Sequence, residues 1–387
     1  MTARLVLLAA MILPLLGCGK NAIHFMREGG PVAQVPAVEQ TATLRKLWRR
    51  DLGAGYQKSN FLLTPSFQAG RLYAAEPEGR IYALDAESGA VIWKRDLKEP
   101  LAAGVGVDTR QAIVVTREGE VVSLDTEGGD LRWRQKMGAE ILARPVLTEK
   151  QVLLRSGDGQ VIGADLESGE ILWRVRRSVP ALTVRGLSAP LIIDNVALIG
   201  FASGRLSGID VASGAELWSA RIFRARGSNE VNRLVDIDSD PYQMGDRLII
   251  AGFQAQISAV SLKTRRIEWD AEHSTLRPLS SVGNVLLVTK DDGSVSGLDI
   301  QSGAQIWKVA ALQGRGVSGP FGLESRGLAV VGDYKGLLYL LDFASGELVG
   351  RKKGGGGAVL GIYDSGDQDR FVTLSENGSL TAWAVGE

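Results

Sequence analysis

The stretch that recurs along this chain reads Asp158-Gly-Gln-Val-Ile-Gly-Ala-Asp165-Leu-Glu-Ser-Gly169-Glu-Ile-Leu-Trp173. A glycine in a turn is followed by an apolar run, an aspartate after six residues, a second glycine after ten and a tryptophan after fourteen. The copies are Gly79, Asp85, Gly89, Trp93; Gly119, Asp125, Gly129, Trp133; Gly159, Asp165, Gly169, Trp173; Gly204, Asp210, Gly214, Trp218; the degraded Ala255, Ser261, Arg265, Trp269; Gly293, Asp299, Gly303, Trp307; and Gly336, Asp342, Gly346, Gly350. One structural unit is therefore repeated in tandem.

Successive turn positions, the last of them Gly378, lie 40, 40, 45, 51, 38, 43 and 42 residues apart. This period is typical of four-stranded propeller blades. The eighth copy ends before a tryptophan can appear, while residues 44–50, which contain Trp48, resemble a tryptophan segment without its repeat. We therefore predict an all-β, eight-bladed β-propeller of four antiparallel strands per blade, closed by the N-terminal strand in the last blade.

Within the third copy, the alternation of apolar residues predicts strands at 144–147, 151–156, 160–165 and 171–175, from the innermost to the outermost. The regular phase of the tryptophans favours a structural role, in which each ring fills the gap between neighbouring blades. The aspartate and second glycine are expected to shape the last hairpin of each blade, the aspartate by capping turn amides. Trp383 is out of phase and is predicted to lie in the core.

Composition excludes several classes of function. Lys plus Arg and Asp plus Glu both number 44, so no global basic field favours nucleic acid. The single cysteine, Cys18, rules out an intramolecular disulfide and a cysteine-based metal site. The two histidines, His24 and His273, form no credible catalytic triad. The 236–247 stretch resembles the start of a calcium loop but lacks its glycine and final glutamate, so we expect no metal and no cofactor.

The N-terminus indicates export and anchoring. Arg4 precedes an apolar run at 5–16 that is too short to span a bilayer but long enough for a signal-peptide core. The run ends Leu15-Leu16-Gly17-Cys18, which resembles the bacterial lipobox, in which the cysteine is lipidated. We expect a signal peptide at 1–17, a flexible tether at 18–41 and the propeller at 42–387. Gly19 follows instead of the aspartate of an inner-membrane retention signal, which favours the periplasmic face of the outer membrane.

Two consecutive connections between blades are unusually long. From an outer-strand tryptophan to the next inner strand takes 12 residues after Trp93 and after Trp133, but 17 from Trp173 to Pro190 and 23 from Trp218 to Pro241. We call these two segments the first joint and the second joint. Extra length in a ring with otherwise short connections is usually functional.

The joints contain the motifs Leu-Thr-Val-Arg185-Gly-Leu-Ser-Ala-Pro and Asn-Arg233-Leu-Val-Asp236-Ile-Asp238-Ser-Asp240-Pro. With the lipobox and the eight repeats, they resemble the BamB family, lipoproteins of the bacterial outer-membrane β-barrel assembly machinery. The resemblance covers residues 18–387 and implies a non-enzymatic scaffold whose two joints dock onto the POTRA domains of BamA. It places the contacts at Leu182, Val184, Arg185, Asp236 and Asp238, with Val184 where leucine is usual.

The resemblance also implies indirect contact with the other Bam subunits, and unfolded outer-membrane proteins as a further candidate partner. From the residues, apolar anchors beside an arginine and two carboxylates on one side of a strand suit a protein interface. Two other interpretations stay open at this point. The repeat also resembles that of pyrroloquinoline quinone (PQQ) dehydrogenases, and a glycan-binding propeller would require exposed aromatic residues in the channel.

Overall fold

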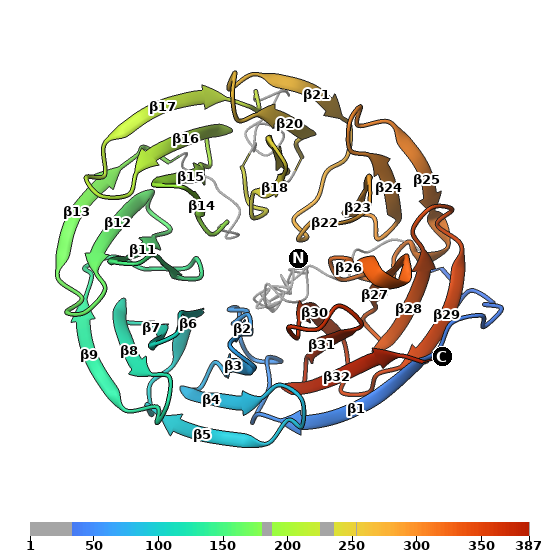
Figure 1. Ribbon diagram of the computed structural model, residues 1–387, viewed down its shortest axis with the longest axis horizontal. Helices are drawn as coiled ribbons and strands as arrows, with labels where there is room; N and C mark the ends of the chain where they lie inside the picture. The colour runs from blue at the N-terminus through green and yellow to red at the C-terminus, as the bar shows by residue number, and fades with distance from the viewer. Residues whose placement is uncertain (1–32, 180–187, 225–235, 253, 387) are drawn as a thin grey trace, which may run out of the picture.

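The computed structural model describes residues 33–179, 188–224, 236–252 and 254–386. In these ranges the strands form eight four-stranded antiparallel sheets arranged in a ring around a central channel (Figure 1). The first strand of each sheet lies next to the channel and the last lies at the rim. The predicted all-β propeller of eight blades is confirmed.

Blades 1 to 4 follow the chain without interruption. Their strands are β2 (Ser66–Gln68), β3 (Arg71–Ala75), β4 (Arg80–Asp85) and β5 (Val91–Asp96); β6 (Leu101–Val107), β7 (Gln111–Thr116), β8 (Glu120–Asp125) and β9 (Leu131–Lys136); β10 (Val146–Leu147), β11 (Gln151–Arg155), β12 (Gln160–Asp165) and β13 (Ile171–Arg176); β14 (Leu191–Ile193), β15 (Val196–Gly200), β16 (Arg205–Asp210) and β17 (Glu216–Arg221). The four strands of blade 3 match the predicted ranges to within two residues at each end.

Blades 5 to 8 complete the ring. Their elements are β18 (Tyr242–Met244), β19 (Arg247–Ile250), β20 (Ile257–Ser261) and β21 (Ile267–Ala271); β22 (Ser280–Val282), β23 (Val285–Thr289), β24 (Val295–Asp299) and β25 (Gln305–Val309); β26 (Phe321–Leu323), β27 (Leu328–Gly332), β28 (Leu337–Asp342) and β29 (Leu348–Lys353); β30 (Val359–Asp364), β31 (Arg370–Ser375), β32 (Ser379–Val385) and β1 (Leu44–Asp51). Two short 3-10 helices, η3 (Ala310–Leu312) and η4 (Glu324–Arg326), lie in connections of blades 6 and 7.

The ring is closed by β1, as predicted. This strand pairs antiparallel with β32, from Leu44 opposite Val385 to Asp51 opposite Ser379, and so forms the rim strand of the blade that also contains the C-terminus (Figure 1). Pairing of the first strand with the last removes the free edge that β32 would otherwise expose.

The repeated tryptophans join each blade to the next. Their indole N–H groups donate to backbone carbonyls of the following blade: Trp48 to Ala86 (3.0 Å), Trp93 to Thr126 (2.8 Å), Trp133 to Leu166 (2.9 Å), Trp173 to Val211 (2.9 Å), Trp269 to Ile300 (3.1 Å) and Trp307 to Phe343 (2.7 Å). Each ring lies over the second glycine of that blade's repeat; a Cβ on Gly169, for example, would lie 2.5 Å from Cε3 of Trp133. The structural role predicted for the tryptophans is confirmed, and Trp383 is buried in the core.

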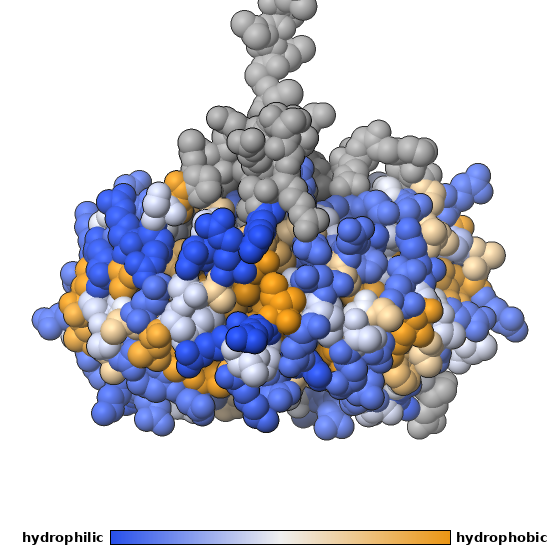
Figure 2. Space-filling model, turned by 90° about the horizontal axis from the view of Figure 1, so that it is seen from above, coloured by the Kyte–Doolittle hydropathy of each residue, from blue (hydrophilic) through white to orange (hydrophobic). Residues whose placement is uncertain are grey.

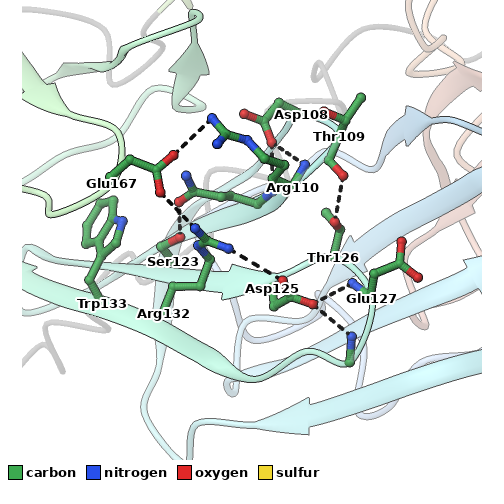
Figure 3. A network of polar contacts seen from close by, with 12 residues as sticks. Asp108, Thr109, Arg110, Ser123, Asp125, Thr126, Glu127, Arg132, Trp133 and Glu167 are labelled. Carbon is green, nitrogen blue, oxygen red and sulfur yellow. Dashed lines mark hydrogen bonds and ion pairs between the residues drawn. The ribbon is translucent and has the colours of Figure 1, made fainter.

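Figure 3 shows the same seam between blades 2 and 3 at its polar rim. Arg110 and Arg132 of blade 2 both point toward Glu167 of blade 3, at 2.9 and 2.8 Å from its two carboxylate oxygens. Asp125 accepts hydrogen bonds from the amides of Glu127 and Gly128 at 2.8 and 3.1 Å, as predicted for this position of the repeat. Exposed ion pairs of this kind each contribute little to stability. The buried tryptophan therefore contributes most of the stabilisation at this contact between blades.

Two seams depart from this rule. In the degraded fifth copy, Arg265 takes the place of the second glycine, and its guanidinium lies 5.3 Å from the ring centre of Trp218, which stays half-buried. In the seventh copy, Gly350 takes the place of the tryptophan because backbone passes there: a Cβ on Gly350 would lie 2.3 Å from the carbonyl oxygen of Ala42. The Ala42 carbonyl thus lies where a side chain at position 350 would begin.

Residues 33–41, the end of the predicted tether, are hydrogen-bonded to the propeller. The amide of Ala33 donates to the Gln313 carbonyl at 3.1 Å, and Arg315 donates to the Ala33 carbonyl at 2.9 Å. Farther along, Arg351 donates to the Pro36 carbonyl at 2.9 Å. The earlier part of the predicted tether, and Cys18 with it, lies outside the described residues.

The rim of the ring mixes polar and apolar side chains. Large exposed apolar residues lie on the outermost strands, and Figure 2 shows such hydrophobic patches between hydrophilic ones on the side wall in that view. They are Val91, Ile92, Leu131, Ile171, Leu172, Leu217, Ile267 and Ile306. In the described ranges, no helix has the length and apolar character of a membrane span.

Candidate partner-binding site at the two joints

The two joints are bonded to each other where the structure describes them. In the first joint, the Ser188 hydroxyl donates to the Ile237 carbonyl of the second joint at 3.1 Å. The Ala189 amide donates to the Asp240 carboxylate at 2.6 Å. The two sequence motifs, about fifty residues apart, therefore belong to one structural unit.

Arg155, at the end of β11, lies beneath this junction. Its side chain is 3% exposed, and one terminal nitrogen donates to the carbonyl and the hydroxyl oxygen of Ser188 at 2.8 and 2.7 Å. The guanidinium carbon lies 5.6 Å from the ring centre of Phe201 in blade 4, within reach of a cation-π contact. Arg155 thus connects blades 3 and 4 to the first joint.

The second joint runs close to the sheets of blades 4 and 5. A Cβ on Gly200 would lie 2.1 Å from the Ile237 side chain, and one on Gly252 would lie 2.0 Å from the Asp236 carbonyl oxygen. Gly252 is therefore needed for the backbone at 236 to approach so closely, and Gly200 for the Ile237 side chain to do so. This packing fixes the described end of the second joint, where Ile237 is fully buried.

Asp236 and Asp238 lie in irregular backbone and not on a strand, so the predicted placement on one side of a strand is wrong. The fully buried Ile237 between them packs against Gly200, a constraint that the local alternation of residues does not reveal. Asp236 is itself buried and Asp238 is half-buried. The other predicted contacts, Leu182, Val184 and Arg185, lie outside the described residues.

The charges at the junction influence one another. Burial lowers the pKa of Arg155 to about 10, an effect opposed by Asp238, Asp240 and Asp236. The pKa of Asp238 is raised to about 8, first by burial and then by the neighbouring Asp236, while Arg155 opposes the shift. Among the described residues, no three His, Cys, Asp or Glu side chains gather in a way that could hold a metal ion. Acidic side chains thus gather around a buried cation, an arrangement that suits a polar protein contact.

A hollow of about 430 Å³ opens beside the start of the first joint. Arg177 on its wall is paired with Glu216 at 2.6 Å, and its Phe201 is the ring that contacts Arg155. The hollow is lined by Arg177, Ser178, Val179, Phe201, Ser203, Arg205 and Ser207. The junction therefore combines charged, hydroxyl and aromatic surface next to the first joint.

Sequence reasoning missed Arg155, although the repeat contains a signal for it. Four residues before the turn glycine, where Arg155 stands, other copies have an uncharged side chain, such as Ala75, Val115, Gly200 and Thr289. Only blade 3 has a long cationic side chain at this position, which indicates a contact that the repeat itself does not require. Comparing the copies column by column would have identified it.

The fold and the junction define the class of protein as a propeller built from PQQ-like repeats, with two joined connections on consecutive blades. A family model described as "Outer membrane protein assembly factor BamB" matches residues 33–102, 77–309 and 291–385. The chain belongs to this family.

Individual relatives agree with this assignment. The outer membrane protein assembly factor BamB of Pseudomonas aeruginosa is 42% identical over 346 residues, which are 89% of this chain and 90% of that protein. The crystal structure of BamB from Moraxella catarrhalis superposes with a TM-score of 0.81 at 26% identity, covering 88% of this chain and 100% of that chain. A quinohemoprotein alcohol dehydrogenase from Comamonas testosteroni reaches a TM-score of 0.68 at 12% identity, covering 90% of this chain and 78% of that chain, a likeness of fold alone.

Proposed function

We propose that the chain is a non-catalytic scaffold lipoprotein of the outer-membrane β-barrel assembly complex, which binds the POTRA domains of BamA and so promotes folding and insertion of outer-membrane proteins. It is anchored through Cys18 on the periplasmic face of the outer membrane. Unfolded outer-membrane proteins are a further candidate partner. Membership of the BamB family supports this role.

The observation that carries the proposal is the junction of the two joints. Hydrogen bonds from Ser188 and Ala189 to Ile237 and Asp240 make one unit from the segments on which the expected contacts lie. A partner that touches one joint therefore meets the other in a fixed relation, which lowers the entropic cost of binding. Leu182, Val184 and Arg185 supply the contacts from the first joint, and Asp236 and Asp238 those from the second.

Capture of BamA by the tagged chain tests the proposal. Arg185→Ala and the double change Asp236→Ala/Asp238→Ala should abolish co-purification, because each removes polar side chains from the expected contact. Because Asp236 is buried, the single change at the half-buried Asp238 is made as well, and every variant is checked by its melting temperature. Matched controls are Arg266→Ala and Asp130→Ala, both exposed and in turns between the last two strands of a blade, outside the two joints.

The controls should retain capture of BamA. Full capture by Arg185→Ala, Asp238→Ala and the double variant, each still folded, would contradict docking through the joints. Loss of capture by the controls to the same extent would instead show that BamA binding depends on charge in general and not on this site.

A further inference from the structure

Positive charge is unevenly distributed along the rim, although the chain as a whole carries no net charge. The rim strands β1 and β29 contain seven cations and, as their one acidic residue, Asp51. We call these cations the basic strip: Arg45, Lys46, Arg49, Arg50, Arg351, Lys352 and Lys353. By contrast, the rim strand β21 contains Glu268 and Asp270 and no cation.

The two strands of the basic strip lie side by side. Although β1 and β29 belong to different sheets, they contact each other, and the Thr41 and Ala42 amides both donate to the Val349 carbonyl at 2.9 Å. In Figure 1 they are neighbours on the outer edge of the ring. All members of the strip are exposed except Arg351, which is half-buried. The cations thus lie on two neighbouring strands at the rim of the ring.

Four members of the strip are available for an external anion. Arg49 is paired with Asp51 at 3.1 Å, Arg50 donates to the Gly89 carbonyl at 2.5 Å and Arg351 is bonded to Pro36. In the described part of the chain, no ion pair or side-chain hydrogen bond engages the remaining four, Arg45, Lys46, Lys352 and Lys353. Unpaired cations gathered on one surface create a field that attracts anionic partners.

We propose that the basic strip rests on an anionic phospholipid surface and forms a second membrane contact beside the lipid anchor. This inference rests on the proposed anchoring at Cys18. The segment that arrives from the anchor, residues 33–43, passes along β29 and continues directly into β1. Its first described residue lies fifteen positions after Cys18, a span of at most about 50 Å when fully extended.

A second contact of this kind has a physical purpose. Acyl chains at Cys18 hold the chain on the membrane but do not orient the ring, whereas each Lys or Arg near an anionic surface adds attraction at a defined place on it. Anchor and strip lie at the two ends of one segment, so contact at both would fix which edge of the ring faces the bilayer. The joints, on blades 3 to 5, would then keep a constant orientation toward their partner.

Flotation with lipid vesicles tests the strip apart from the anchor. Residues 19–387 contain the closed ring and its entire described core, but not the apolar run or Cys18. This chain should float with phosphatidylcholine vesicles that contain about 30% phosphatidylglycerol, less so at high salt, and not with phosphatidylcholine alone. Changing Arg45, Lys46, Lys352 and Lys353 to Gln should reduce bound protein at least about tenfold.

The matched control removes the same charge elsewhere, through Lys58→Gln, Lys98→Gln, Lys150→Gln and Lys263→Gln, all at exposed positions. It should float like the unchanged chain. Equal flotation of the two variants, or no preference for anionic vesicles, would overturn the inference.

Capture of BamA is measured on the same variants. Loss of capture by the strip variant without any change in flotation would place an acidic protein on the strip instead. Retained capture with lost flotation supports the strip and leaves the docking proposal intact.

Discussion

The second glycine of each repeat shows how one residue determines a contact between blades. Gly169 has φ +76° and lies under the ring of Trp133, with 2.5 Å between its virtual Cβ and Cε3 of the indole. Two separate constraints therefore act on this position. Its backbone conformation favours glycine, and the indole of Trp133 from the preceding blade packs directly on it.

The two constraints can be separated by experiment. Gly70 has the same φ of +76° but no heavy atom within 4 Å of its virtual Cβ, so Gly70→Ala should cost only about 1–2 kcal/mol of backbone strain. Gly169→Ala should cost that amount and about 1–3 kcal/mol more, because the tryptophan must move. Melting temperatures of the two variants measure the difference, and equal losses would show that the indole does not press on the glycine.

The pKa of Asp238 predicts a dependence of stability on pH. Its pKa is raised from 3.8 to about 8 by burial and by Asp236, so the folded chain holds a proton that the unfolded chain has already released above about pH 4. Raising the pH from 4 to 8 therefore lowers the stability of the native chain, and this loss is complete above pH 8.

Asp238→Asn removes this titration. The stability of the variant relative to the native chain should increase with pH across the same window, by at most about 1.4 kcal/mol per pH unit. Thermal melting of both proteins at pH 5, 6.5 and 8 measures the gap. A gap that stays constant or shrinks as the pH rises would contradict the raised pKa.

Among elements, the N-terminal segment has the most unexpected role. In the seventh repeat it replaces the tryptophan, since the backbone of Ala42 passes over Gly350 and the amides of Thr41 and Ala42 are bonded to Val349. The missing tryptophan was visible in the sequence. Its substitute was not, because the replacement comes from about 300 residues away and has no motif.

Gly350→Ala should detach this segment. The new methyl group would meet the Ala42 carbonyl, so the hydrogen bonds to Val349 should open, and amide exchange of Thr41 and Ala42 should accelerate at least about tenfold. Gly128→Ala is a suitable control, because the virtual Cβ of Gly128 meets only a flexible Asp130 side chain, at 3.3 Å. Unchanged exchange at Thr41 and Ala42 in the Gly350 variant would show that the segment does not need the glycine.

Sequence periodicity predicted the elements because every blade repeats the same constraints. Strand ranges in blade 3, the roles of Trp133 and Asp125, and closure through Trp48 all follow from comparison of copies. The junction of the joints was less accessible, because it depends on contacts that no copy shares: Arg155 under Ser188, and Ile237 against Gly200. The expected strand at Asp236 and Asp238 failed for that reason.

At the scale of the whole molecule, stability depends on closure of the ring between β1 and β32. Arg45 and Ala384 are opposite each other in this pairing, and opposite positions bring Cβ atoms close to the separation that a disulfide spans. A disulfide from Arg45→Cys and Ala384→Cys in the chain of residues 19–387 should stabilise it by roughly 3–5 kcal/mol, since it closes nearly the full length of the chain.

A disulfide within one hairpin provides the comparison. Gln160 and Arg176 are opposite each other in β12 and β13. A bridge between cysteines at these positions closes a short loop, so it should stabilise the chain by at most about 3 kcal/mol. Melting temperatures with and without reductant give both effects. A ring bridge that stabilises the chain less than the hairpin bridge would indicate that β1 separates from β32 without loss of the remaining fold.

The central claim, that the two joints form the surface on which BamA docks, is tested most directly by site-specific photocrosslinking in membranes. A photoreactive amino acid at Val184 should form a covalent product with BamA, while the same group at the exposed Arg266, in a turn of blade 5, should form none. A BamA product from position 266 but not from position 184 would contradict the account.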